Sequence, residues 1–180
     1  DMIECVNAFY EGMVARSEEM KQHPDYKTGE NYAYLGLLPC FLIFDEYVAF
    51  LEMLGTKESM SLLSQLKKIV MLGRQAGYFL IVACQRPDAK YFSDGIRDNF
   101  NFRVGLGRIS ELGYGMLFGS DVKKQFFQKR IKGRGYCDVG TSVISEFYTP
   151  LVPKGHDFLQ TIGSLALARQ AVPEKQKEID

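Results

Sequence analysis

Two uninterrupted apolar runs of strand length constrain what this chain can fold into. The first, Cys40–Phe44, ends directly in two carboxylates, Asp45 and Glu46, and the second, Tyr78–Cys84, ends at Gln85. An apolar run without alternation is typical of a strand that is covered on both faces, as in a parallel sheet. We therefore expect two buried strands, each of which ends in a polar side chain.

Helical patterns precede, separate and follow these strands. Residues 2–22 and the stretch after Thr56, which we expect to cap its helix, place apolar side chains three and four positions apart, and Gly77 ends the second pattern. Strands that alternate with helices predict βα units, a parallel sheet and right-handed crossovers. The other expected elements are a loop at 23–36, a strand at 102–106, a helix at 109–118, a hairpin of 136–139 with 142–148, and a last helix from His156.

Composition limits the class of protein. With 180 residues and 46% hydrophobic content, the chain can bury one sizeable core, which we assign to residues 1–155, with a helix and a charged tail at 156–180. Its 22 basic and 22 acidic residues exclude a global field that would attract nucleic acid or an anionic membrane. Its four cysteines form no C-x-x-C pair, which argues against structural zinc and disulfides and favours the cytoplasm.

The ends of the two expected strands carry side chains suited to nucleotide chemistry. In open α/β sheets ligands bind at the carboxyl ends of the strands, so Asp45, Glu46 and Gln85 should face one crevice. An apolar strand that ends in Asp-Glu has the layout of a Walker B site, and a glutamine at the next tip can hydrogen-bond a γ-phosphate and the attacking water. The alternative is two ordinary acids and a loop glutamine in solvent.

Three stretches then follow in a recognisable order: LIFDEYVAF, GRQAGYFLIVACQRP and DNFNFRVGLGRIS. Together they resemble the FtsK/SpoIIIE branch of the HerA-FtsK DNA-pumping ATPases, including relatives carried by conjugative elements, over roughly Leu38 to Val139. The resemblance implies the C-terminal part of a RecA-like P-loop NTPase domain, a three-layer α/β sandwich with a mostly parallel sheet. It also implies ATP, Mg²⁺, a hexameric ring and double-stranded DNA, in a process such as chromosome partition or conjugation.

The family pattern assigns roles to the residues at the strand ends. By position, Asp45 is the metal-shell residue, Glu46 the catalytic base and Gln85 the phosphate sensor. Arg103, which opens the following strand, matches an arginine that could reach a neighbouring subunit's nucleotide, where such a finger contributes ~10³ or more in rate.

Each arginine that matches the family has a structural alternative. Arg103 could instead pair with an acid such as Asp88 or Asp98. Arg74 and Arg86 also match family arginines, and for them the structural role is the favoured interpretation.

The chain departs from the family in two places. The P-loop pattern G-x-x-x-x-G-K-[ST] does not occur, because Gly55-Thr56-Lys57 has the letters in the wrong order and follows the Asp-Glu pair. Without that phosphate cradle the sheet should lack its P-loop strand and show a gap, and these residues alone should bind nucleotide weakly without turnover. In addition, Leu112 stands near a position where the family commonly has an arginine.

A basic stretch at 123–134 contains six cations and no acid. As a DNA-facing surface it would contact phosphates in a salt-dependent way that does not depend on base sequence. The alternative is an amphipathic segment that buries Phe126 and Phe127. The six candidate DNA-binding residues are Lys123, Lys124, Lys129, Arg130, Lys132 and Arg134.

Three functions therefore remain open for the chain. The first is a segment of a DNA translocase motor. The second is a non-catalytic DNA-binding or docking module that keeps the fold, and the third is another P-loop ATPase of conjugation or secretion. Any membrane attachment would come through segments outside these residues, because no apolar run approaches the ~20 residues of a membrane helix.

Overall fold

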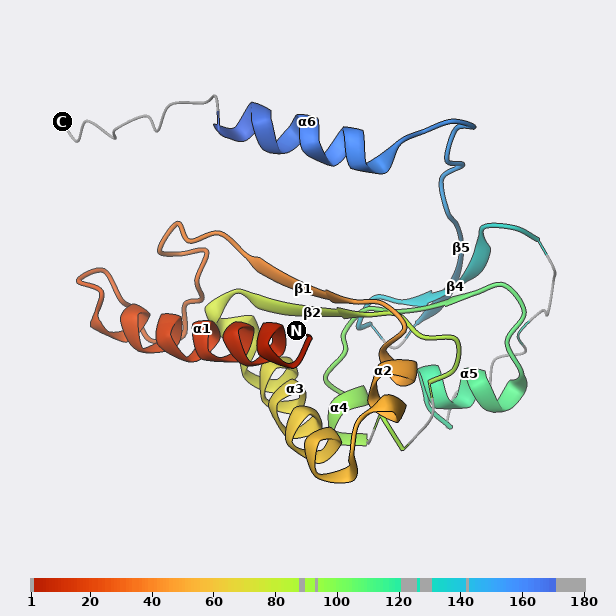
Figure 1. Cartoon of the computed structure of the whole chain (residues 1–180), viewed down its shortest axis with the longest axis horizontal. Coiled ribbons are helices and arrows are strands. Elements are labelled where there is room, and N and C mark those ends of the chain that lie inside the picture. The colour runs from red at the N-terminus through yellow and green to blue at the C-terminus, as the bar shows by residue number, and fades with distance from the viewer. Residues whose placement is uncertain are drawn as a thin grey trace. The chain divides into compact units, whose positions relative to one another are not determined.

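A computed structural model describes residues 2–87, 90–92, 94–120, 126, 131–141 and 143–170. The chain divides into two compact units, Asp1–Phe147 and Tyr148–Asp180. The elements, labelled in Figure 1, are α1 (Met2–Gln22), β1 (Cys40–Phe44), α2 (Tyr47–Met53), α3 (Thr56–Ala76), β2 (Tyr78–Val82), α4 (Asp94–Arg97), β3 (Arg103–Leu106), α5 (Glu111–Phe118), β4 (Arg134–Asp138), β5 (Ile144–Tyr148) and α6 (Phe158–Gln170).

β1 and β2 pair in parallel, as the two apolar runs predict. Their register runs from Cys40 opposite Tyr78 to Phe44 opposite Val82. β2 ends at Val82, two residues earlier than expected. The chain turns there, and Ala83 forms hydrogen bonds with residues on both sides of the Asp45-Glu46 pair. In that turn the Ala83 amide donates to the Phe44 carbonyl at 2.9 Å, and the Ala83 carbonyl accepts from the Tyr47 amide at 3.1 Å.

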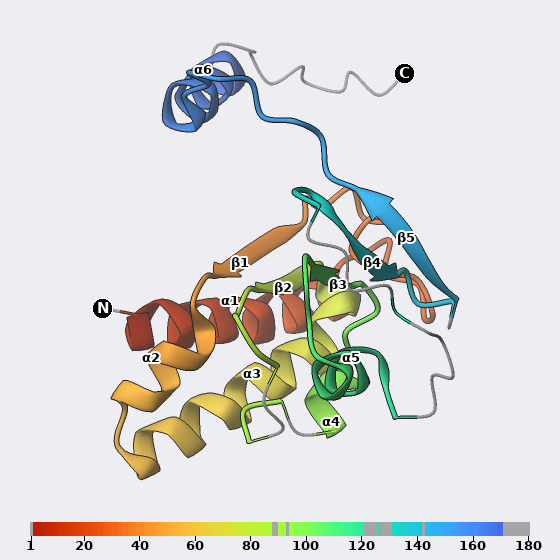
Figure 2. The same ribbon diagram turned by 90° about the vertical axis from the view of Figure 1, so that its right-hand side faces the viewer.

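The helices α1 and α3 cover one face of this parallel pair, on the same side of it in both views (Figures 1 and 2). The apolar positions that define their helical periodicity form the core with the inward side chains of β1. The buried residues of this core include Val6, Met13, Leu42, Phe44, Leu62, Leu66 and Ile69. The α/β class and the predicted βα unit are thus confirmed.

The opposite face of the β1–β2 pair lies open. Phe41, Ile43 and Ile81 are 55%, 70% and 48% exposed, and the rings of Phe41 and Phe79 stack on each other at 5.5 Å. The expectation of cover on both faces is wrong for the described part of the chain. The physical reason is that α1 and α3 both lie on one side of the pair, and unbroken apolarity cannot indicate which side a helix takes.

The remaining strands form a separate, three-stranded sheet in the order β3-β4-β5. β3 runs antiparallel to β4, with Arg103 opposite Asp138 and Leu106 opposite Gly135. The third predicted strand therefore does not extend the parallel pair, and the described strands make two sheets with a break between β2 and β3. Such a break is what we expect of a sheet that lacks its P-loop strand.

An aromatic cluster holds α5 against the second sheet. The Tyr114 ring lies 4.1 Å from that of Phe126, nearly parallel to it, and both contact Tyr136 edge-on. Phe118 stacks on the same group. The glycine-interrupted helix is held at its start by the Ser110 hydroxyl, which accepts a hydrogen bond from the helix's third backbone amide at 3.1 Å.

The ends of α3 show how the chain changes direction before and after the helix. Gly55, not Thr56, occupies the N-cap position, and its amide donates to the Glu58 carboxylate at 3.3 Å. Thr56 is the first helical residue, so its assignment as the cap is wrong by one position. The Glu58 carboxylate, and not a threonine hydroxyl, accepts a hydrogen bond from a backbone amide at this helix end. Gly77 ends the helix as predicted, with φ of 77°, a conformation that favours glycine.

The second unit contains α6. The helix begins at Phe158 because the Asp157 side chain caps it, accepting from the Gln160 amide at 3.0 Å. The charged tail 171–180 lies outside the described residues. Across the described part of the chain, no helix combines the length and apolarity that crossing a membrane requires.

Gly73→Ala tests the close packing of α3 on β2. A Cβ at Gly73 would lie 2.2 Å from the Tyr78 carbonyl oxygen, a backbone atom that cannot rotate away. Overpacking of this kind costs about 1–3 kcal/mol. We expect urea unfolding to show a loss in that range for Gly73→Ala. Gly115→Ala in α5, whose added Cβ meets nothing within 4 Å, is the control and should lose nothing; equal stability of the two variants would contradict the packing.

Candidate functional site

The parallel register brings the polar side chains of the two strand ends to one edge. Asp45 follows β1 directly, and Gln85 lies in the turn after β2. The Gln85 side-chain amide lies 3.5 Å from Glu46 Oε1, the long end of the hydrogen-bond range. Asp45, Glu46 and Gln85 are all exposed. The structure thus places the predicted base and the predicted sensor side by side and open to a ligand.

Glu46 occupies an unusual backbone conformation. With φ of 51° and ψ of 38° it lies in the left-handed region, and it is the one non-glycine residue with positive φ that the described ranges contain. That conformation costs roughly 1–2 kcal/mol for an L-residue. The neighbouring Asp45 carboxylate accepts the Glu46 amide at 3.0 Å and so supports the turn. Strained residues cluster at functional sites, which makes this turn a candidate on backbone geometry as well.

The Glu46 carboxylate influences the pKa of the half-buried Cys84 thiol, in the turn after β2. Burial raises the pKa of the Cys84 thiol, a hydrogen bond from the Arg86 backbone lowers it in part, and the Glu46 carboxylate raises it further. Cys84 is half-buried and lies two residues after the end of β2. The thiol should therefore be slow to form the thiolate that reacts with alkylating agents.

The electrostatic link between Glu46 and Cys84 predicts a measurable change in thiol reactivity. Glu46→Gln removes the carboxylate charge, which lowers the pKa of Cys84, so alkylation of that thiol at pH 8 should become faster. Mass spectrometry of the Cys84 peptide after timed alkylation measures the rate. Exposed Cys5 is the internal control and should react at the same rate in both proteins; an unchanged or slower Cys84 in the Glu46→Gln protein would contradict the placement.

The carboxylates fit a magnesium ion that is shared with phosphates. Mg²⁺ prefers oxygen ligands and is usually held by one or two carboxylates, several waters and substrate phosphates. Asp45 and Glu46 supply such oxygens at an exposed edge. Among the residues with defined positions, no three His, Cys, Asp or Glu side chains gather closely enough to hold a metal. Two adjacent carboxylates are a donor set of the kind that Mg²⁺ shares with phosphate oxygens.

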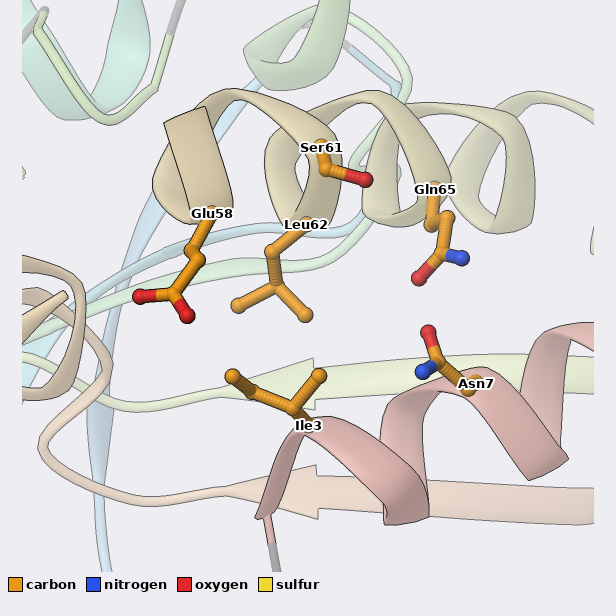
Figure 3. A pocket seen from close by; sticks show the side chains of 6 residues that line it. All are labelled: Ile3, Asn7, Glu58, Ser61, Leu62 and Gln65. Atoms are coloured by element: carbon orange, nitrogen blue, oxygen red, sulfur yellow. The ribbon is translucent and has the colours of Figure 1, made fainter. Parts of the chain in front are cut away.

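Side chains of α1 and α3 line a small crevice (Figure 3). Its volume is about 160 Å³, below the roughly 300–1,000 Å³ of typical ligand pockets. Asn7 and Gln65 point toward each other across it, as do Ile3 and Leu62. None of the predicted nucleotide residues lines it. We interpret it as a packing gap between two helices.

Arg103 is engaged within its own unit. Its guanidinium lies 3.2 Å from the Asp138 carboxylate and donates to the Leu117 carbonyl at 3.2 Å. Its side chain is 19% exposed, and that of Asp138 is 5% exposed. Among the described acids it is Asp138, not Asp98, that pairs with Arg103, and Asp88 lies outside the described residues. A role for Arg103 in trans stays a prediction, and it requires the arginine to give up this pair.

Removal of Arg103 should destabilise the fold. Arg103→Ala leaves the buried Asp138 carboxylate without its cation, a change that costs about 3–5 kcal/mol for a buried pair. The free energy of unfolding in urea measures the loss. Arg74→Ala is the control: Arg74 is exposed, and surface substitutions usually stay within about 0.5 kcal/mol. A protein with Arg103→Ala that is as stable as the control would show that the pair contributes little.

The basic stretch is only partly described. Lys123, Lys124, Lys129 and Arg130, with Phe127, lie outside the described residues. Phe126 packs into the aromatic cluster around Tyr114, as the amphipathic alternative expects. Arg134 pairs with the Glu146 carboxylate on the neighbouring strand, to which the Tyr136 hydroxyl also donates at 3.1 Å. All six candidate DNA contacts stay predictions, and of the described ones Lys132 is exposed.

Sequence reasoning missed two buried tyrosines near the strand ends, Tyr47 and Tyr91. Tyr47 is 2% exposed, and burial raises the pKa of its hydroxyl far above the ordinary value, with Cys84 adding to the effect. Tyr91 is also buried and donates to the Glu52 carboxylate at 3.0 Å. The sequence does place a tyrosine immediately after Asp45-Glu46. Helical periodicity predicts only that this residue is buried, and it does not predict a partner for the hydroxyl.

Comparisons with known proteins agree with the family resemblance. The chain is 59% identical over 158 residues to the "Ftsk domain-containing protein YdcQ" of Bacillus subtilis (strain 168), an alignment that covers 88% of this chain and 33% of the relative. The chain thus spans about a third of that protein's length. No family model matches the sequence.

Two solved structures share the fold. The cytoplasmic domain of the type VII secretion ATPase EccC of Thermomonospora curvata superposes with a TM-score of 0.63 at 21% identity, over 85% of this chain and 18% of that one. The pCW3 conjugation coupling protein TcpA, in its monomer form with ATPγS, gives 0.67 at 17% identity, over 91% of this chain and 49% of that one. At these identities the likeness concerns the fold alone.

Proposed function

Because this chain belongs to the FtsK-domain family, we propose that it supplies the hydrolytic strand ends of an ATP-driven motor that moves double-stranded DNA. The observation that carries the proposal is the juxtaposition of Glu46 and Gln85, 3.5 Å apart at the ends of two parallel strands. A base and a phosphate-sensing amide must meet at one γ-phosphate to act together. The register of β1 and β2 supports that arrangement.

Each residue of the strand ends has a distinct role in the proposed reaction. Asp45 would hold a magnesium ion through its water shell, and such an ion would supply neutralisation of charge on the phosphates. Glu46 orients and polarises the attacking water. Gln85 donates from its amide toward the γ-phosphate or the water. The exposure of all three side chains leaves room for the ligand between them.

The motor acts as a ring of copies, which we infer to be hexameric. Arg103 is the candidate to reach the neighbouring subunit's nucleotide, but its guanidinium is held by Asp138 at 3.2 Å. A finger role therefore includes an exchange of partner, from Asp138 to the phosphoryl group. Arg103 lies on β3 of the second sheet, separate from the β1–β2 pair that carries the other candidate residues.

The DNA partner is proposed from the family and from the basic stretch at 123–134, with Lys132 as its exposed described member. A second cargo, a polypeptide, is favoured by the structural likeness to a secretion ATPase, whereas the likeness to a conjugation coupling protein favours DNA.

We place the motor in the cytoplasm, where ATP is available. Conjugation is the process that fits the second likeness better than chromosome partition does.

Steady-state ATP hydrolysis tests the proposed function. These 180 residues alone should show no turnover, because their sequence contains no P-loop to hold the phosphates. The chain joined to its natural upstream sequence should hydrolyse ATP, and double-stranded DNA should stimulate it. Glu46→Gln should abolish turnover, whereas Glu11→Gln, a change of the same size at an exposed position of α1, should retain it.

Each other outcome has a definite meaning. Turnover by the 180 residues above a buffer blank would contradict the predicted inactivity. Turnover that DNA does not stimulate would favour the polypeptide cargo. No turnover in the extended protein would leave a non-catalytic module that keeps the fold.

A further inference from the structure

Tyr47 directly follows Glu46 in the sequence and is the first residue of α2. Its buried ring packs edge-on against Phe44 at 5.5 Å, on the strand that ends in Asp45. The ring also contacts that of Phe92 at 5.0 Å, in the segment that follows Gln85. One side chain therefore touches both chain segments that carry the candidate catalytic groups.

The polar groups of Tyr47 join the same two segments. Its backbone amide donates to the Ala83 carbonyl at 3.1 Å, and its hydroxyl donates to the Tyr91 carbonyl at 3.3 Å. Ala83 and Tyr91 stand on either side of Gln85 in the sequence. The hydrogen bonds of Tyr47 thus bracket the turn from which the glutamine projects.

The partner of the Tyr47 hydroxyl is itself fixed in place. The Tyr91 hydroxyl donates to the Glu52 carboxylate at 3.0 Å and accepts from the Lys90 ammonium at 2.8 Å. Glu52 belongs to α2, the helix that Tyr47 opens. The segment after Gln85 is consequently tied to α2 at two points, through a backbone carbonyl and through a side chain.

Packing alone does not explain why the buried residue 47 is a tyrosine and not a phenylalanine. A buried hydroxyl that loses its partner costs roughly 1–3 kcal/mol, whereas phenylalanine would fill the same space without that risk. The Tyr47 hydroxyl donates to the Tyr91 carbonyl, in the segment beyond Gln85. Its position therefore serves to hold that segment against α2.

We propose that Tyr47 is a positioning residue that fixes Gln85 relative to Glu46. The inference rests on the proposed hydrolysis of ATP at this site. Tyr47 is bonded covalently to Glu46 and through hydrogen bonds to both sides of Gln85, so it sets the 3.5 Å separation of the two side chains. It touches neither nucleotide nor water in this scheme and acts only through its neighbours.

Tyr47→Phe in the full-length protein tests this role, because it removes the hydroxyl and keeps the ring. A net hydrogen bond contributes about 0.5–1.5 kcal/mol, which corresponds to roughly 2- to 12-fold in rate if it is expressed in the transition state. We expect kcat for ATP to fall within that range while KM changes less than twofold. Rates are normalised to the folded fraction, because partial unfolding lowers the apparent kcat without changing KM.

Tyr114→Phe is the matched control. Tyr114 is also buried, and its hydroxyl donates to the Gly107 carbonyl at 3.4 Å, but it lies in the aromatic cluster of the second sheet. Both variants lose one interior hydroxyl with a backbone partner, so their thermal midpoints should fall by similar amounts. Rates are compared at a temperature where both are folded, and Tyr114→Phe should keep the wild-type kcat.

Four outcomes decide the proposal. A selective fall in kcat for Tyr47→Phe supports it, and a smaller effect of Tyr47→Phe in a Gln85→Ala background shows that it acts through the glutamine. An unchanged kcat, or an equal fall for Tyr114→Phe, overturns the positioning role while the proposed hydrolysis stands. A wild-type protein without turnover overturns both.

Discussion

The parallel pairing of β1 with β2 is the interaction on which the candidate site depends. Its register places Phe44 opposite Val82, and the turns beyond these residues carry Glu46 and Gln85 to contact distance. A slip of one residue would move Phe44 from the core to the open face and bring Ile43 inward. The burial of alternate β1 side chains under α1 and α3 therefore fixes both the fold and the geometry of the strand ends.

Much of this arrangement follows from the sequence. Five apolar residues before Asp45 predict β1, and the helix ended by Gly77 predicts the parallel partner that returns to the same edge. The meeting of Glu46 with Gln85 needs only that connection, because parallel strands end together. What the apolar run could not indicate is that Ile43 faces outward, since a strand covered on one face and a strand covered on both can have the same composition.

Contacts between distant segments were beyond sequence reasoning. Arg103 pairs with Asp138 because β3 and β4 run antiparallel in a register that only the folded sheet sets. The same holds for Tyr47, whose hydroxyl reaches a carbonyl 44 residues away. In both cases a residue type that suits a catalytic or packing role in the sequence takes a structural partner in the fold. Arg103 thus combines a position suited to a finger with a stabilising contact.

We propose that Glu46 drives hydrolysis of a nucleotide that other groups bind. The most direct measurement is the identity of the nucleotide that stays bound after full-length protein is incubated with ATP and Mg²⁺, separated by chromatography. The wild-type protein should hold ADP, and the Glu46→Gln protein should hold a similar amount of nucleotide as ATP. Conversion to ADP in the Glu46→Gln protein at the wild-type rate would contradict the claim.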